Sequence, residues 1–243
     1  MRLKGEMVIE LIDTNTGAVE TVQETNMITE AVNNILGLNP MGIYLKASWE
    51  YDNSVLWNGT LLPICPNMIG GILLFPAVLE EKADHIYEQG QNLPVAYASN
   101  NVNSGSNVAR GSLNQTESKK LDNGYKFVWE FTPSQGNGNI AAVALTSALG
   151  GQNAFGSEAG DFQITADDRV IKTQGSARFE AMATPLFQYK NFVFMWGGSY
   201  GKEHRCAYLL TPYLASINNL SSAVVKNTDK TMKITYTLTE ETM

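Results

Sequence analysis

The chain has 243 residues, a net charge of -7 and only 17% charged residues, with many uncharged polar residues in their place. Its length and its 44% hydrophobic content predict a substantial buried core and exclude a disordered chain. The longest basic run is Lys119–Lys120, so the sequence argues against nucleic-acid binding, which needs clustered lysine and arginine. No apolar run approaches ~20 residues, so we expect no membrane span.

The first segments predict a hairpin followed by a helix. Residues 6–12 and 18–22 are typical of strands, and residues 13–17 are typical of the turn between them. The helix is expected to start at an N-cap, Thr25 or Asn26, and to end at Gly37. Its apolar positions form two rows at i,i+4 spacing: Met27, Ala31 and Ile35, then Ile28, Val32 and Leu36.

Residues 38–106 are less regular, because they hold five of the eight prolines and few alternating runs. Residues 68–75 predict a buried strand with a Gly70–Gly71 bend, and residues 76–87 predict a short helix. Residues 100–107 predict an exposed loop. We interpret 38–106 as a Pro-rich insertion in a single β-rich domain that spans residues 1–243.

The most informative stretch is residues 123–146. Tyr125, Phe127, Trp129 and Phe131 alternate with other residues, which places all four rings on one face of a strand. Residues 135–138 predict a turn that sets the register of this strand against the next one. Residues 140–145 are apolar at every position, so the second strand is expected to be buried on both faces.

The rest of the chain is also rich in predicted strands. Strands are expected at 108–116, 162–165, 187–196 and 205–211, with a helical turn within 212–223. In 231–239, apolar residues alternate with threonine and lysine. We predict that this strand pairs with the N-terminal one or lies beside it, because chain termini often lie close together. The fold class is therefore mainly β, an antiparallel β-sandwich-like core with one short N-terminal helix and one or two minor helical turns.

Residues with catalytic potential are few. The two histidines stand in Asp84–His85 and Glu203–His204, and neighbouring side chains on a strand point to opposite faces. Zinc-ligand spacing, a nucleophile elbow and a phosphate-binding glycine loop are all missing. Cys65 and Cys206 imply no disulfide framework. We therefore expect no enzyme, no cofactor, and no catalytic, cofactor-binding or metal-binding residue.

Two weaker possibilities stay open. Asp161, Asp167 and Asp168 flank the strand at 162–165 and could bind Ca²⁺ through loop oxygens, although solvated turn acids are the favoured interpretation. The aromatic strand at 125–131 could stack on sugars if exposed, although its regular apolar face favours core packing. Residues 1–12 lack the apolar segment of a secretory signal.

Three parts of the chain together resemble a structural-protein family of tailed phages and prophages of Firmicutes: residues 24–36, residues 124–131 with 135–140, and residues 231–239. The resemblance implies a virion component of the tail tip, baseplate or fibre region, assembled in the bacterial host cytoplasm as a symmetric homo-oligomer that contacts other virion proteins. It carries over no catalytic residue. The alternatives are a carbohydrate-binding module that recognises a host cell-surface glycan, a head or neck protein such as a collar or head fibre, and a glycan-degrading enzyme with two carboxylates.

Overall fold

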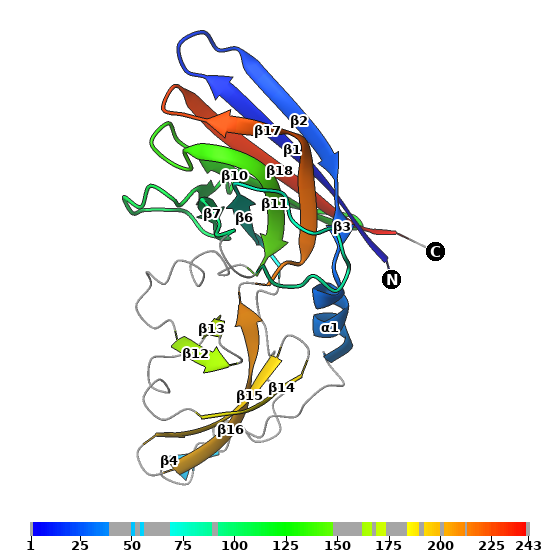
Figure 1. The fold of residues 1–243 in the computed structure, drawn as a ribbon, viewed down its shortest axis with the longest axis vertical. Helices are drawn as coiled ribbons and strands as arrows, with labels where there is room; N and C mark the ends of the chain where they lie inside the picture. The colour runs from blue at the N-terminus through cyan, green and yellow to red at the C-terminus, as the bar shows by residue number, and fades with distance from the viewer. Residues whose placement is uncertain are drawn as a thin grey trace.

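The computed structural model describes residues 2–38, 50–51, 54–55, 69–88, 92–147, 162–166, 169–173, 184–189, 192–199, 202–211 and 213–241. In these residues the chain forms two large antiparallel sheets packed face to face, a third sheet below them and one short helix (Figure 1). The predicted fold class, a mainly β protein with a sandwich-like core and a short N-terminal helix, is confirmed.

One large sheet contains the first and last strands of the chain, and we call it the terminal sheet. Its strand order is β2-β1-β18-β10-β8, with β9 also paired to β10. The bounds are β1 Arg2–Asp13, β2 Val19–Thr25, β8 Ser112–Leu113, β9 Lys119–Leu121, β10 Gly124–Phe131 and β18 Lys230–Glu241. β1 and β18 pair along their whole length, from Arg2 opposite Glu241 to Asp13 opposite Lys230. The predicted pairing of the two terminal strands is confirmed.

The other large sheet, the facing sheet, has the order β3-β17-β11-β6-β7. The bounds are β3 Met27–Ile28, β6 Gly71–Phe75, β7 Ala96–Ala98, β11 Gly138–Thr146 and β17 Ser216–Lys226. β6 is buried at every position and follows Gly70, whose φ of 144° suits only glycine, so the predicted strand and bend are confirmed. β6 and β7 fall within the range that the prolines mark as irregular, and both belong to the sandwich.

The core lies between the two sheets. The rings of Phe127, Trp129 and Phe131 are at most 6% exposed and pack in one cluster with residues of both sheets, which confirms the predicted aromatic face. The Trp129 indole Nε1 donates to the Ser99 carbonyl at 3.1 Å, so its polar atom is satisfied. β11 is buried on both faces as predicted, because Ala142 and Ala144 pack in a second cluster on the other side of the facing sheet.

The link between β10 and β11 differs from the predicted turn. β10 pairs with β18, β8 and β9, whereas β11 pairs with β17 and β6, so these consecutive strands lie in opposite sheets. Residues 132–137, which we call the arch, therefore cross from one sheet to the other and set no register. The arrangement lets the aromatic face of β10 pack against Ile140, Val143 and Leu145 across the core.

The helix α1, Glu30–Leu38, starts later than predicted and includes Gly37. Met27 and Ile28 instead form β3, which pairs with Ile217 and Ser216 of β17. Thr29 precedes the helix, and its Oγ1 accepts from the Ala31 amide at 3.3 Å. Sheet pairing therefore outweighs the local helical pattern over the first predicted turn.

Both minor helical segments were predicted wrongly. Residues 76–87 form a loop on the facing sheet, where the Leu79 amide and carbonyl both bind the Asn219 side chain at 2.8 Å. Most of 212–223 belongs to β17. In both cases hydrogen bonds to distant segments replace those that a local helix would make.

The predicted strand at 108–116 is only partly correct. It pairs with β10 through the two residues of β8, and an exposed loop precedes it at 100–107 as predicted. Asparagine side chains shape this region through bonds to the backbone two residues on. Asn103 Oδ1 accepts from the Gly105 amide, Asn107 Oδ1 from Ala109 and Asn114 Oδ1 from Thr116. The abundance of asparagine thus has a local structural role in these turns.

The third sheet has the order β12-β13-β16-β15-β14. The bounds are β12 Phe162–Ala166, β13 Arg169–Thr173, β14 Thr184–Tyr189, β15 Phe192–Ser199 and β16 Lys202–Thr211, and a separate pair is formed by β4 Glu50–Tyr51 and β5 Ser54–Val55. The strands predicted at 162–165 and 205–211 are confirmed. The single strand predicted at 187–196 is wrong, because β14 and β15 form a hairpin there.

Candidate functional site

The described residues contain no group of three or more His, Cys, Asp or Glu side chains placed to hold a metal ion. Asp161, Asp167, Asp168 and Cys65 lie outside the described residues, so the calcium hypothesis remains a prediction. Within the same described part, no helix has the length and apolar character needed to cross a bilayer.

His85 lies in the loop at 76–88, close to two glutamate side chains. Its Nε2 lies 2.8 Å from Glu88 Oε2, and its Nδ1 lies 3.9 Å from Glu80 Oε2. The side chains of His85 and Glu88 are each 19% exposed, so this is a partly buried pair. The partner of His85 is therefore Glu88, three residues further along the chain, rather than the adjacent Asp84. The arrangement holds the loop at 76–88 in shape.

A broad surface is provided by the outward side of the terminal sheet. Because Met232, Ile234 and Tyr236 of β18 point into the core, the residues that alternate with them point outward. We call the outward residues of β2, β1, β18 and β10 the threonine face. Its central cross-strand rows are Thr25–Glu6–Thr237–Lys126, Gln23–Val8–Thr235–Val128 and Thr21–Glu10–Lys233–Glu130. Of these outward side chains, Val128 is fully buried.

Two lysines of the threonine face form ion pairs, with glutamates of the face and with Glu117 of the loop between β8 and β9. Lys233 Nζ lies 3.4 Å from Glu10 Oε2 and 3.3 Å from Glu117 Oε2, and Lys4 Nζ lies 3.0 Å from Glu6 Oε1. Partial desolvation lowers the pKa of Lys233, but the bonds to Glu117 and Glu10 outweigh it and leave the pKa above its ordinary value. A face whose charges already pair with each other loses less when a partner removes water from it.

The edge strand β2 of the terminal sheet is less suited than the threonine face to pair with another protein chain. β2 forms this edge, and its Glu20 and Glu24 alternate with the outward residues and so point toward the facing sheet. Glu24 Oε1 accepts from the Ser221 amide of β17 at 2.8 Å, and Glu20 Oε2 binds Lys230 at 3.1 Å. Inward carboxylates on an edge strand disfavour pairing with another chain. The face, and not this edge, is therefore the better candidate for assembly.

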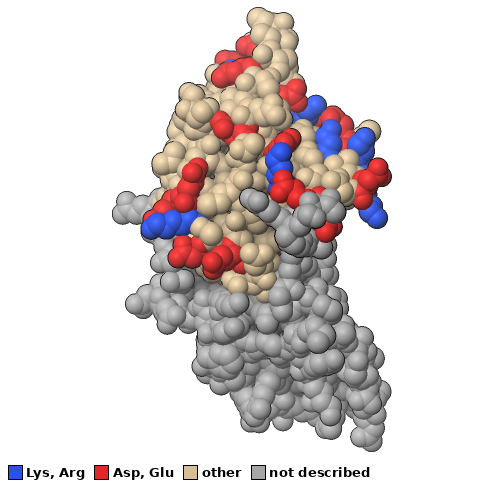
Figure 2. Space-filling view, turned by 90° about the vertical axis from the view of Figure 1, so that its right-hand side faces the viewer, with Lys and Arg blue, Asp and Glu red and all other residues tan. Residues whose placement is uncertain are grey.

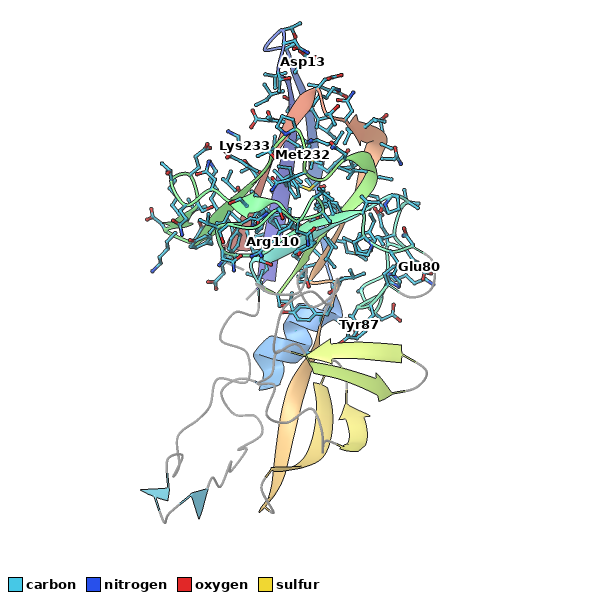
Figure 3. The ribbon with its side chains drawn as sticks, turned by 90° about the vertical axis from the view of Figure 1, so that its left-hand side faces the viewer. Asp13, Glu80, Tyr87, Arg110, Met232 and Lys233 are labelled. Atoms are coloured by element: carbon cyan, nitrogen blue, oxygen red, sulfur yellow. The ribbon has the colours of Figure 1, made fainter. Side chains whose placement is uncertain are left out.

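Figures 2 and 3 show where the threonine face lies and how charged side chains are distributed over the described residues. Lys233 and Glu80 are labelled on opposite sides of the sandwich in Figure 3, so the threonine face lies away from the loop at 76–88. On the side shown in Figure 2, acidic and basic side chains lie in small mixed groups beside wide uncharged areas of the described residues. This distribution suits protein contacts more than binding to a strongly charged polymer.

A buried polar network lies behind the threonine face. The Tyr236 hydroxyl donates to Ser216 Oγ at 2.7 Å and accepts from the Asn26 side-chain amide, whose Oδ1 accepts from the Gly5 amide at 2.9 Å. The Leu145 amide also donates to Ser216 Oγ, at 3.2 Å. Burial raises the pKa of Tyr236 far above its ordinary value. The network joins β1 and β18 of the terminal sheet to β17 and β11 of the facing sheet.

A second buried polar group, the ammonium of Lys226, forms hydrogen bonds with three residues of the arch. Lys226 is 1% exposed, and its Nζ donates to Thr132 O and Asn137 Oδ1 at 2.9 Å and to Pro133 O and Asn227 O at 3.3 Å. All four acceptors are uncharged. Burial lowers the pKa of Lys226 to about 8. Sequence reasoning missed this lysine, although its place two residues after the buried Val224 marks it as inward-facing.

In comparisons with protein-family models, with curated proteins and with solved structures, nothing matches this chain. The candidate site therefore depends on the geometry described above.

Proposed function

We propose that this chain is a non-enzymatic structural protein of a tailed bacteriophage particle, a component of the tail tip, baseplate or fibre region that assembles as a symmetric oligomer through the threonine face. The observation that carries the proposal is the face itself. It is a regular surface of four paired strands that carries many uncharged polar side chains, and its Lys233 and Glu10 form an ion pair.

Further support comes from the contacts that hold the two sheets of the sandwich together. The terminal strands pair over their full length, and buried side-chain hydrogen bonds tie the two sheets together. A scaffold of this kind presents a rigid surface, so little conformational entropy is lost when a partner binds. The resemblance of residues 24–36, 124–131 with 135–140, and 231–239 to virion proteins is consistent with this role.

The carbohydrate-binding alternative has less support. It needs aromatic rings on an open surface, but Phe127, Trp129 and Phe131 are buried. Among the described residues, the large hydrophobic side chains that are exposed are valine and leucine. The aromatic strand that motivated the sugar-stacking hypothesis belongs to the core.

The role in a particle is tested by peptide mass spectrometry of purified virions from the phage that encodes this chain. We expect the chain in intact particles at a constant ratio to the major capsid and tail proteins, including after washing at high salt. Its recovery only in the soluble lysate, with none in particles, would contradict the proposal. The amount per particle also gives the copy number.

A further inference from the structure

The arch contains an asparagine in an unusual environment. Asn137 lies at its exposed end, and its side-chain Nδ2 donates to the Pro133 carbonyl at 2.9 Å. Its Oδ1 accepts from the buried ammonium of Lys226, also at 2.9 Å. The next residue is Gly138, which has no side chain to hinder an approach of its backbone nitrogen to the Asn137 side chain.

Among the described residues, no carboxylate is paired with Lys226. The four oxygens that it binds are three backbone carbonyls and one side-chain amide. A buried ammonium is more stable beside a carboxylate than beside neutral acceptors. Asn137 is the surrounding side chain that can become a carboxylate.

We propose that Asn137 is a self-modification site, at which the side-chain amide is converted to a carboxylate that pairs with Lys226. In the first step the Gly138 backbone nitrogen forms a bond to Asn137 Cγ and gives up its proton, and the Cγ–Nδ2 bond breaks with release of ammonia. A five-membered imide results. Water then adds to one imide carbonyl and breaks its bond to nitrogen, which leaves aspartate or isoaspartate. One water is consumed and one ammonia is released.

Lys226 assists this reaction in two ways. When nitrogen adds to Cγ, negative charge develops on Oδ1, and the ammonium 2.9 Å away stabilises that charge. The product carboxylate then forms a charge-assisted hydrogen bond with the same ammonium, which raises the stability of the modified chain. Lys226 thus positions the Asn137 side chain and stabilises the negative charge that forms on it, without itself reacting.

The chain contains a matched internal control. Asn123 also precedes a glycine, and its Nδ2 donates to the Glu240 carbonyl at 3.3 Å. Among the described hydrogen bonds, none joins its Oδ1 to a lysine or arginine. These two Asn-Gly pairs, the two that lie in the described residues, share the dipeptide and differ in the neighbouring cation.

The test follows both sites in the full-length chain at neutral pH in ¹⁸O-labelled water, by peptide mass spectrometry over several weeks. We expect Asn137 to convert with uptake of ¹⁸O about tenfold faster than Asn123, and Lys226→Met to remove most of that difference. Conversion at Asn123 while Asn137 remains an amide would overturn the proposal. A peptide of Asn137 joined to a peptide of Lys226 would also overturn it, because the lysine would then be the nucleophile.

Because Lys226→Met is expected to weaken the fold, a second variant tests the same idea. Asn137→Asp supplies the carboxylate directly and should raise the midpoint of thermal unfolding and the pKa of Lys226. Asn123→Asp is its matched control and should leave both unchanged. A lower midpoint for Asn137→Asp than for the natural chain would contradict a favourable pair with Lys226.

Discussion

Replacement of Lys226 by methionine should lower the free energy of unfolding by about 2 kcal/mol at neutral pH, even though it removes a buried charge. Hydrogen bonds from a charged donor contribute about 1.5 kcal/mol each or more, and the three N–H groups of the Lys226 ammonium are shared among four acceptors. Burial of the ammonium, which lowers its pKa to about 8, offsets about 3 kcal/mol of that gain. The hydrogen bonds therefore outweigh the cost of desolvation.

Denaturation by urea, followed by circular dichroism, measures this change. Lys233→Met is the matched control, because Lys233 is a partly exposed member of ion pairs on the threonine face. We expect it to cost less than about 1 kcal/mol, as surface ion pairs do. An equal loss in the two variants, or a gain in Lys226→Met, would show that the ammonium does not hold the arch.

Tyr236→Phe should lower the free energy of unfolding by about 2 kcal/mol, because it leaves Ser216 and Asn26 without the hydroxyl that joins them. Tyr125→Phe is the control and should change stability by less than about 0.5 kcal/mol, since Tyr125 is only half-buried and no hydrogen bond of its hydroxyl is described. Urea denaturation of the three proteins at neutral pH compares them directly. A near-zero effect of Tyr236→Phe would contradict a role for the network in joining the sheets.

The stability difference between the natural protein and Tyr236→Phe should also depend on pH. The pKa of Tyr236 is raised in the folded state above its ordinary value of 10.0, so only the unfolded chain ionises this group near pH 10. The stability that Tyr236 contributes is present below that pH and is lost as pH rises further, by up to about 1.4 kcal/mol per pH unit. The difference between natural protein and Tyr236→Phe should therefore shrink above pH 10. A constant difference would show that the hydroxyl ionises equally in both states.

Periodic patterns in the sequence predicted much of the sandwich. Alternation in 231–239 and 125–131 identified the inward side of β18 and of β10, and the tendency of chain termini to lie close together led to the correct pairing of the two terminal strands. These predictions succeed because a period of two reports directly which side chains are buried. The all-apolar run of 140–145 likewise identified a strand buried on both faces.

The errors have a different origin. A short turn-like segment links strands equally well within one sheet or between two, so residues 135–138 gave no sign of an arch. Local helical spacing at Met27 and Ile28 was overruled by pairing with β17. Lys226 was missed because a single buried lysine produces no periodic pattern, and three of its four acceptors lie in the arch, far from it in sequence.

Assembly through the threonine face is tested most directly by the mass of the purified chain in solution, measured by size-exclusion chromatography with light scattering. We expect a multiple of the 26.6 kDa monomer for the natural protein and for Ser222→Arg, which lies on the exposed bend of β17. Thr237→Arg, at the centre of the face, should yield a folded monomer. A natural protein that is monomeric at high concentration, or an oligomer that Thr237→Arg leaves intact, would contradict assembly through this face.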